Sequence, residues 1–273
     1  MSTTLLHLHT QPEVPLEAET LSPASIAGLS ELGIEHLQVM HGNVRAKMGD
    51  FFKVTGKGTR DIHVEGDLSK VKMIGAGMSE GRVFVEGNVG MHIGIGMSGG
   101  EILVKGDATD WVGPEMSGGR ITIEGNAGHM VGSAFRGQST GITGGEIFIH
   151  GSVKNEVGNS MRRGLIAIGG DAGDFTAVSM RAGTVIVMGK VGVRTGAGMV
   201  RGTVVCFEEG SILPSFEYSC RYQPLFLRLY LIRLQEHGFG EKIMDKHLNG
   251  KYKRYSGDGV ELNRGEILLF SGQ

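Results

Sequence analysis

One phrase recurs along this chain at a spacing of nineteen residues, and it restricts the possible folds more than any other feature. The phrase consists of two apolar residues around one variable position, then a second variable position, a glycine and usually Asn or Asp. An insertion of seven residues around 137–144 interrupts the spacing once, and the first two copies are weaker and more widely spaced. In chain order, the copies begin at Val39, Ile62, Val83, Ile102, Ile121, Ile147, Ile166 and Val185. A repeat of this length predicts a stack of similar structural units.

Each copy of the phrase predicts a short strand with one face turned inward, because its apolar residues alternate with period two. The glycine that follows permits the positive φ of a corner, and the Asn or Asp after it tolerates left-handed backbone and can hydrogen-bond its own main chain. Strands of successive coils would pair in parallel, roughly 4.8 Å apart. The sequence therefore predicts a mainly β chain, a single-stranded β-helix (β-solenoid) of about eight nineteen-residue coils and roughly 38 Å in length.

Two further positions recur within the coils. A second glycine usually follows the first by seven residues, at Gly49, Gly94, Gly113, Gly132, Gly158 and Gly196, with Gly75 in a longer coil and Ala177 as the exception. A large apolar residue follows the first glycine by ten residues, or a little more in the longer coil, at Phe52, Met78, Met97, Met116, Phe135, Met161, Met180 and Met199. Because equivalent positions stack, and because a thioether fills irregular space well, we expect an internal ladder of methionines.

The two ends of the chain fall outside the repeat. Residues 1–36 contain a candidate strand, Thr4–Leu8, and a candidate helix, Pro23–Leu32. Residues 212–273 contain a set of apolar residues that predicts a helix beside the last coil: Leu225, Phe226, Leu229, Ile232 and Leu234. Terminal coils need covers for their open strand edges. We therefore predict N-terminal and C-terminal α/β caps around a solenoid of residues 37–211.

The composition supports an ordered, turn-rich fold and excludes several classes of protein. Glycine accounts for 47 of the 273 residues but lacks the three-residue spacing of collagen, and the 40% of hydrophobic residues argues against disorder. A net charge of −2 predicts no nucleic-acid partner, and the absence of a long uncharged apolar run predicts no membrane span. The two cysteines imply no disulfide framework, and the charged N-terminal segment does not resemble a signal peptide. The expected location is the cytoplasm.

Several motifs suggest chemistry, but each has a simpler explanation. Gly94–Gly99 matches the GxGxxG fingerprint, yet a strand rather than a helix follows it. A nucleotide-dependent oxidoreductase is therefore a disfavoured alternative of another class. His7 and His9 share one face of a strand, as metal-binding pairs do, but no β/α alternation exists for a barrel around them, and a structural role is favoured. Cys220 is interpreted as a plain reduced thiol and His150 as a solvated side chain. No catalytic residue and no metal ligand is predicted.

Arginines gather at equivalent places in the last coils and form the candidate binding residues. They should line one edge of the rod: Arg162, Arg163, Arg181, Arg194 and Arg201. Stacked like charges cost free energy unless something acidic offsets them. Two interpretations remain open: a solvated basic edge, or a docking strip for an acidic partner or a polyanionic cofactor.

The Gly-x-Gly-x-Met-x-x-Gly repeats and the non-repeating end resemble two related groups of proteins. One is the C-terminal GXGXG domain of the glutamate synthase large subunit, and the other is the C subunit of formylmethanofuran dehydrogenase. Three C-terminal blocks resemble the end of that C subunit: Pro224–Tyr230, Tyr252–Asp258 and Gly265–Leu268. The resemblance covers nearly the whole chain.

The resemblance implies a non-catalytic scaffold subunit in one of two settings. In methylotrophic bacteria, the C subunit belongs to a formyltransferase/hydrolase complex that moves a formyl group from formyl-tetrahydromethanopterin to a methanofuran analogue and releases formate. The implied partners there are the amidohydrolase-like A subunit, the B subunit and the formyltransferase D subunit. These partners would hold the methanofuran analogue and the metal, so that this chain binds no cofactor of its own.

The alternative setting is the C subunit of an archaeal tungsten or molybdenum formylmethanofuran dehydrogenase. The bacterial setting is favoured. In it, the resemblance implies that the arginine edge would face the acidic polyglutamate tail of the methanofuran analogue.

Overall fold

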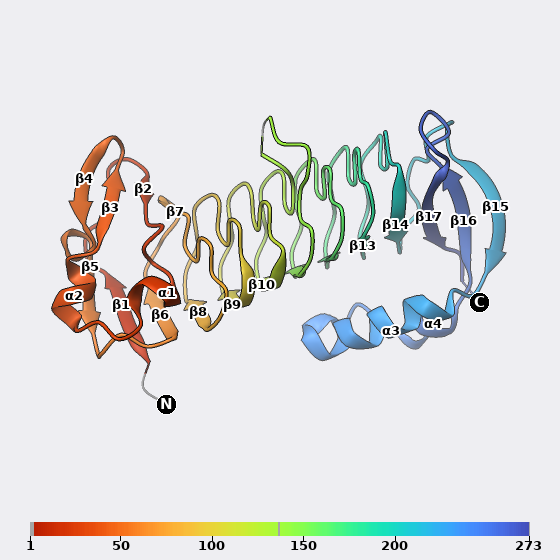
Figure 1. Ribbon diagram of the computed structural model, residues 1–273. Helices are drawn as coiled ribbons and strands as arrows, with labels where there is room; N and C mark the ends of the chain where they lie inside the picture. Colours follow the sequence, from red (N-terminus) through yellow and green to blue (C-terminus); the bar gives the residue numbers. More distant parts are fainter. Residues whose placement is uncertain (1–2, 136, 273) are drawn as a thin grey trace.

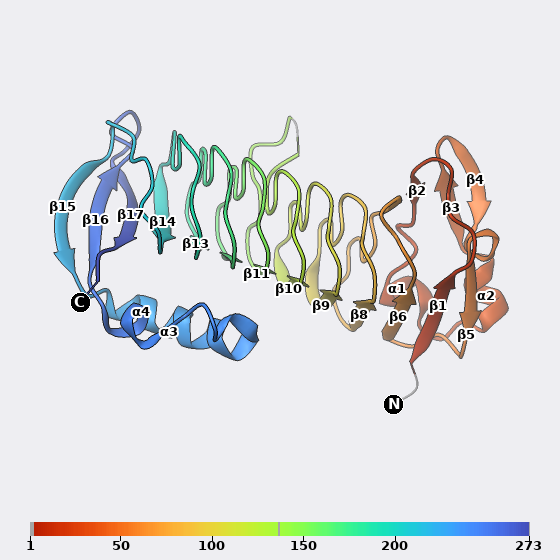
Figure 2. The same cartoon turned by 180° about the vertical axis from the view of Figure 1, so that it is seen from behind.

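A computed structural model describes residues 3–135 and 137–272 and shows a mainly β fold, as predicted. A thirteen-stranded sheet runs in the order β15-β16-β17-β14-β13-β12-β11-β10-β9-β8-β6-β1-β5, and a four-stranded sheet in the order β4-β3-β2-β7. Figures 1 and 2 show the chain winding in successive turns along one axis, with larger structures at both ends. We call the central part, residues 61–206, the rod. Its strands are β6 (Asp61–Glu65), β8 (Arg82–Val85), β9 (Ser98–Val104), β10 (Gly118–Ile123), β11 (Glu146–Ile149), β12 (Leu165–Ile168), β13 (Thr184–Val187) and β14 (Arg201–Cys206).

Neighbouring strands of the rod pair in parallel in the register that the repeat predicts. Ile102 pairs with Ile121 across nineteen residues, and Ile166 pairs with Val185 at the same spacing. Ile121 pairs with Ile147, so the seven-residue insertion is excluded from the ladder and the register resumes after it. The predicted pairing is therefore confirmed from β6 to β14.

The methionine ladder of the rod is buried, but Phe135 is not part of it. Met97, Met116 and Met161 are fully buried, and so is Ile142. Ile142 takes the place predicted for Phe135, because its carbonyl accepts a hydrogen bond from the Arg162 N–H just as the Met161 carbonyl accepts one in the next turn. The insertion enters before the ladder position, so it shifts that position by seven residues. Phe135 instead is half-buried and stacks on Trp111, with ring centroids 6.2 Å apart.

Gly66, which ends β6, has the predicted positive φ of 122°, but the glycines that end the later strands of the rod are needed for a different reason. Gly87 does not have a positive φ; a Cβ on it would lie 2.0 Å from the carbonyl oxygen of Gly66 in the preceding turn. Close approach of stacked backbones therefore excludes a side chain there. The second glycine does have the left-handed backbone, as at Gly94 with φ 65°. Ala177 adopts the same conformation with φ 60°.

Asp67 bonds the local backbone as predicted, accepting from the Ser69 N–H at 3.2 Å, whereas the Asn and Asp side chains of later copies bond the next turn. Asn88 Oδ1 accepts from the Asp107 N–H at 2.8 Å, and Asp107 Oδ1 accepts from the Asn126 N–H at 2.7 Å. Asn126 Oδ1 accepts in turn from the Ser152 N–H at 2.9 Å. This corner of the rod thus gains a polar ladder that satisfies backbone donors outside the strands.

The N-terminal part that precedes the rod is longer than predicted. β3 (Gln38–His41) and β4 (Val44–Lys47) form an antiparallel hairpin, so the coil predicted at Val39 is wrong. β1 (Thr4–Leu8) pairs antiparallel with β5 (Phe52–Thr55) and parallel with β6, which places β1 at the start of the rod. The predicted helix Pro23–Leu32 is two short helices, because Gly28 has a left-handed backbone between them. The remaining elements are β2 (Leu16–Glu17), α1 (Pro23–Ile26), α2 (Glu31–Glu35) and the 3₁₀ turn η1 (Met48–Asp50). β7 (Val71–Lys72) lies in the first turn of the rod and pairs parallel with β2.

The C-terminal part extends the sheet with β17 (Arg264–Phe270), which pairs parallel with β14, and with β16 (Tyr252–Gly257) and β15 (Glu217–Tyr222), which pair antiparallel. The predicted helix is α3 (Leu225–Leu234), followed by the irregular turn η2 (Gln235–Phe239) and α4 (Asp245–Asn249). Figures 1 and 2 show that α3 runs back along the rod instead of lying only beside its last turn.

A second apolar core holds α3 against the outer side of β11 to β14. Leu227, Leu231 and Leu234 pack there against outward-facing apolar residues of four consecutive turns: Phe148, Ala167, Ile186 and Val205. His150 belongs to the same contact and is half-buried against the Phe239 ring, so its predicted solvation is wrong. Burial lowers the pKa of His150. Among the described residues, no helix is long and apolar enough to cross a membrane.

Candidate functional site

The predicted arginine edge borders a groove at the C-terminal end of the rod. The groove has a volume of about 970 Å³. Its lining comes from the turns between β10 and β14 and from the loop between β16 and β17: Thr143, Ser160, Arg162, Arg163, Ser179, Arg181, Ala182, Gly183, Gly198, Val200, Arg201 and Glu261. Four of the five predicted arginines therefore lie in one site.

The repeat places Arg162 above Arg181 at one position, and Arg163 and Arg201 at the next position along the chain, where Ala182 lies between them. The Arg162 N–H donates to the Ile142 carbonyl at 2.9 Å, and the Arg181 N–H donates to the Met161 carbonyl at 2.8 Å. The Val200 N–H makes the equivalent bond to Met180, and Arg201 follows directly. The equivalent positions in earlier turns hold no basic residue, so the basic edge begins with the turn of Arg162: they are Ser79 and Glu80, Ser98 and Gly99, Ser117 and Gly118, and Thr143 and Gly144.

The groove carries positive charge that the chain itself leaves without acidic partners. All four arginines are exposed, and none forms an ion pair with a carboxylate within residues 3–135 and 137–272. Glu261 is the carboxylate among the lining residues. Guanidinium groups pair strongly with carboxylates and phosphates but do not exchange protons in proteins. The site is therefore suited to binding an anionic group rather than to acid–base catalysis.

Arg194 lies outside the groove. Its guanidinium carbon is 5.2 Å from the centroid of the Phe175 ring, in a cation–π contact. Arg194 follows Val193 in the part of the turn before the second glycine, whereas the groove arginines follow the methionine ladder. The predicted set of five arginines is therefore reduced to four.

The sequence offered no sign that the C-terminal loop would border the groove. Asp258 Oδ2 accepts a hydrogen bond from the Gly198 N–H at 2.9 Å, and Asp258 Oδ1 accepts one from the Val260 N–H at 3.0 Å. Burial opposes ionisation of Asp258, but these hydrogen bonds outweigh it and lower its pKa. Asp258 thereby ties the loop that carries Glu261 to the last turn of the rod.

The other motifs do not converge on a reaction centre. His7 Nδ1 lies 3.3 Å from Glu65 Oε2, whereas His9 Nε2 lies 3.3 Å from the Gly49 carbonyl oxygen. The GxGxxG match at Gly94–Gly99 runs straight into β9, as predicted. Cys220 is exposed, and burial raises the pKa of the other cysteine, Cys206, to about 12.

The chain is similar to several known proteins. The GXGXG motif family model matches residues 86–218. The C subunit of the tungsten-containing formylmethanofuran dehydrogenase 2 of Methanothermobacter thermautotrophicus is 43% identical over 98 residues, which cover 34% of this chain and 36% of that protein. The C subunit of the molybdenum-containing formylmethanofuran dehydrogenase 1 of Methanosarcina barkeri is 41% identical over 86 residues, which cover 30% of this chain and 29% of that protein. The aligned segments thus span about a third of these relatives.

A solved structure matches over nearly the whole chain. It is a chain of the formyltransferase/hydrolase complex (FhcABCD) from Methylorubrum extorquens in complex with methylofuran. The TM-score is 0.89 and the sequence identity 32%, over 98% of this chain and 99% of that chain. The similarity therefore includes the N-terminal and C-terminal parts as well as the rod.

Proposed function

Because this chain belongs to the family of formylmethanofuran dehydrogenase C subunits, we propose that it is the non-catalytic scaffold subunit of a formyltransferase/hydrolase complex. The complex would transfer a formyl group from formyl-tetrahydromethanopterin to a methanofuran analogue and release formate during one-carbon oxidation. The amidohydrolase-like A subunit, the B subunit and the formyltransferase D subunit would be its partners. The observation that carries the proposal is the match to a chain of such a complex over 98% of the present chain.

An exposed apolar surface on α3 supports assembly with partner subunits. α3 contains only two charged residues, and its outward face carries Leu225, Phe226, Leu229 and Ile232. Leu225 is 71% exposed and Leu229 is 73% exposed. Contiguous exposed apolar residues of this kind mark protein–protein contacts. The opposite face of α3 is already buried on the rod, so the free face is available to a partner.

The alternative setting is a tungsten or molybdenum formylmethanofuran dehydrogenase. The aligned parts of those relatives are 41–43% identical to this chain but span about a third of it. The match to the formyltransferase/hydrolase complex extends over the terminal parts as well, which favours the bacterial setting.

The scaffold role is tested by purifying this chain alone and together with its three proposed partners. We expect no formyl transfer and no formate release from the isolated chain, and both activities from the assembled complex. Clear turnover by the isolated chain would show that it is catalytic. Failure to co-purify with any of the three partners would contradict the proposed assembly.

We further propose that the groove holds the polyglutamate tail of the methanofuran analogue, while its reactive head and the metal remain in the partners. The supporting observations are that four arginines without acidic partners in the described chain line one groove, and that guanidinium groups prefer carboxylates. Arg162, Arg163 and Arg181 would clamp successive carboxylates of a flexible chain.

The test replaces Arg162, Arg163 and Arg181 with Ala in the assembled complex. We expect at least tenfold weaker binding of the cofactor, with a loss that shrinks at high salt because the interaction is electrostatic. Arg194→Ala is the matched control, since Arg194 lies in the same turns but outside the groove, and it should bind as the wild type does. Unchanged affinity of the triple variant would reject this role without affecting the scaffold proposal.

A further inference from the structure

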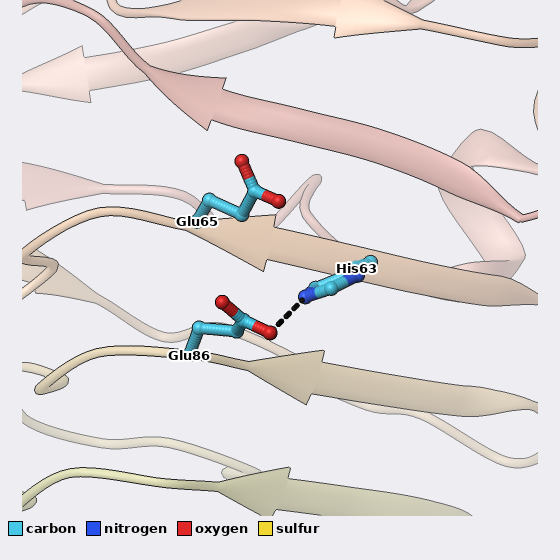
Figure 3. A group of neighbouring side chains, drawn as sticks. All are labelled: His63, Glu65 and Glu86. Carbon is cyan, nitrogen blue, oxygen red and sulfur yellow. Dashed lines mark ion pairs between the residues drawn. The ribbon is translucent and has the colours of Figure 1, made fainter.

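Three side chains of metal-binding type gather on the outer side of the first turns of the rod, far from the arginine groove. His63 and Glu65 lie two residues apart on β6, Glu86 follows β8 directly, and the His63 ring is directed toward Glu86 (Figure 3). One ligand atom from each of the three lies within 4.8 Å of the others. Two adjacent parallel strands thus bring an imidazole nitrogen and two carboxylates to one point.

The charges at this point are not balanced by basic residues. The pairing of Val64 with Val85 places Glu65 and Glu86 side by side on neighbouring strands, where like charges repel. Neither carboxylate forms an ion pair with Lys or Arg in the described part of the chain. Lys105, which follows β9, pairs instead with Glu124, which follows β10 on the far side.

The imidazole is oriented toward the carboxylates but makes no proper hydrogen bond with them. His63 Nε2 lies 3.3 Å from Glu86 Oε1, and this ring atom is buried without a hydrogen-bond partner among the described residues. The ring is held in place by an edge-on contact with Phe84, with centroids 4.7 Å apart. Two carboxylates and an imidazole nitrogen that face one another in this way are held together either by a proton on the imidazole or by a shared metal ion.

Glu65 is also oriented from its other side. His7 Nδ1, on β1, lies 3.3 Å from Glu65 Oε2. A histidine that hydrogen-bonds a carboxylate ligand is the kind of outer contact that fixes ligands in metal sites.

We propose that His63, Glu65 and Glu86 bind one divalent transition-metal ion, with Zn²⁺ as the best fit. A ligand set of one imidazole nitrogen and two carboxylates suits Zn²⁺, whereas Ca²⁺ and Mg²⁺ prefer oxygen ligands alone. The ion would hold β6 and β8 together at the start of the rod. His7 would link β1 to the site through its contact with Glu65. The role is structural, since the site lies apart from the groove, and it does not depend on the proposed function.

The test titrates the chelator-treated, tag-free chain with ZnCl₂ by calorimetry and follows its thermal unfolding. We expect one Zn²⁺ per chain and a rise in Tm, because an ion that binds the native state stabilises it. His63→Ala should weaken binding at least tenfold and abolish the rise in Tm. His9→Ala is the matched control at a nearby exposed histidine, and it should keep both.

The outcomes of this titration distinguish a bound ion from a shared proton. No Zn²⁺ uptake by the wild-type chain would overturn the proposal. It would mean that a proton between His63 and Glu86, and not a metal ion, holds the two side chains together. Equal affinities of the His63→Ala and wild-type chains would also overturn it, because the ion would then bind elsewhere. Should circular dichroism show that His63→Ala is misfolded, Glu86→Gln serves as a second variant with the same expected loss.

Discussion

Gly94 and Gly96 lie two residues apart in one turn and have nearly the same backbone conformation, with φ 65° and 63°. Their surroundings differ. A Cβ on Gly94 would lie 2.4 Å from Ile121 Cδ1, whereas a Cβ on Gly96 would meet nothing within 4 Å. At the residue scale, the repeat therefore uses glycine for two separable reasons, left-handed backbone and lack of space.

Replacing each glycine with Ala should separate these two costs. Gly96→Ala incurs only the strain of a left-handed alanine, roughly 1 kcal/mol. Gly94→Ala adds overpacking against Ile121, which costs about 1–3 kcal/mol more. Urea unfolding of both variants measures the difference, and equal losses of stability would show that the turn relaxes freely around the added methyl group.

α3 lies on the rod as a separate layer, and a few polar contacts hold its end in place. Arg233 donates to both carboxylate oxygens of Glu146, at 2.6 and 2.9 Å, and Arg120 donates to Glu146 at 3.0 Å. Burial opposes ionisation of Glu146, but the hydrogen bonds from Arg233 and Arg120 outweigh it and lower its pKa. Lys242 adds bonds to the carbonyls of His150 and Gly169. These polar contacts fix the end of α3 while leucines fill the space beneath it.

Arg233→Ala should loosen the end of α3 without unfolding the rod. The loss of this paired contact is expected to cost about 1 kcal/mol, which corresponds to a roughly fivefold larger population of the locally open state and equally faster hydrogen exchange. Hydrogen exchange of residues 225–239 measures it. Arg228→Ala, on an exposed side of the same helix, is the control and should leave exchange unchanged; a similar acceleration in both variants would mean that Glu146 does not anchor the helix.

His247 should make the C-terminal part sensitive to acid. It is buried on α4 with its ring stacked on Phe207, and burial followed by the charge of Lys246 lowers its pKa from 6.5 to about 4. The unfolded chain therefore binds more protons than the folded chain between these values, so this residue's contribution to stability falls as the pH drops from 6.5 toward 4, by at most about 1.4 kcal/mol per pH unit.

His247→Phe keeps an aromatic ring but removes the titration. We expect the variant to lose less stability than the wild type between pH 6.5 and about 4, as measured by urea unfolding at several pH values. His9→Ala, at an exposed histidine, should follow the wild-type curve. Parallel curves for His247→Phe and the wild type would show that His247 is protonated in the folded chain as readily as in the unfolded one.

At the scale of the whole molecule, the rod is a sum of similar layers. Successive strands pair at spacings of 19, 21 or 26 residues, and the polar ladder continues across the insertion. Because each turn contacts mainly its neighbours, stability in such stacks is nearly additive over turns. The fold therefore depends on the pairing register between successive turns more than on any particular turn.

Deleting residues 102–120 should therefore leave a folded rod that is one turn shorter, since Ile121 would then stack on Val83 in the same register as Ile102 does. Deleting residues 102–121 removes one residue more and leaves a turn too short to reach the next strand. We expect cooperative thermal unfolding for the first variant and aggregation or a broad transition for the second, because a one-residue slip turns the apolar face outward. Similar melting of the two would mean that the turns tolerate loss of register.

The sequence alone determined the strands of the rod, their parallel register and the family. The strands follow from apolar alternation, and their register follows from a constant spacing along the chain. The pairing of Ile102 with Ile121 can therefore be predicted without knowing the conformation of the residues between them. It also placed Arg162, Arg181 and Arg201 on one edge for the same reason.

Only the tertiary structure decided where the non-repeating segments lie. Apolar residues at outward positions of the strands, such as Phe148 and Ile186, indicate in the sequence that something covers β11 to β14. Periodicity could not identify α3 as the segment that covers them. The approach of Glu261 to the groove and the pairing of Arg233 with Glu146 depend on how the non-repeating C-terminal segment bends. Such contacts join residues at no fixed spacing, so a repeat carries no information about them.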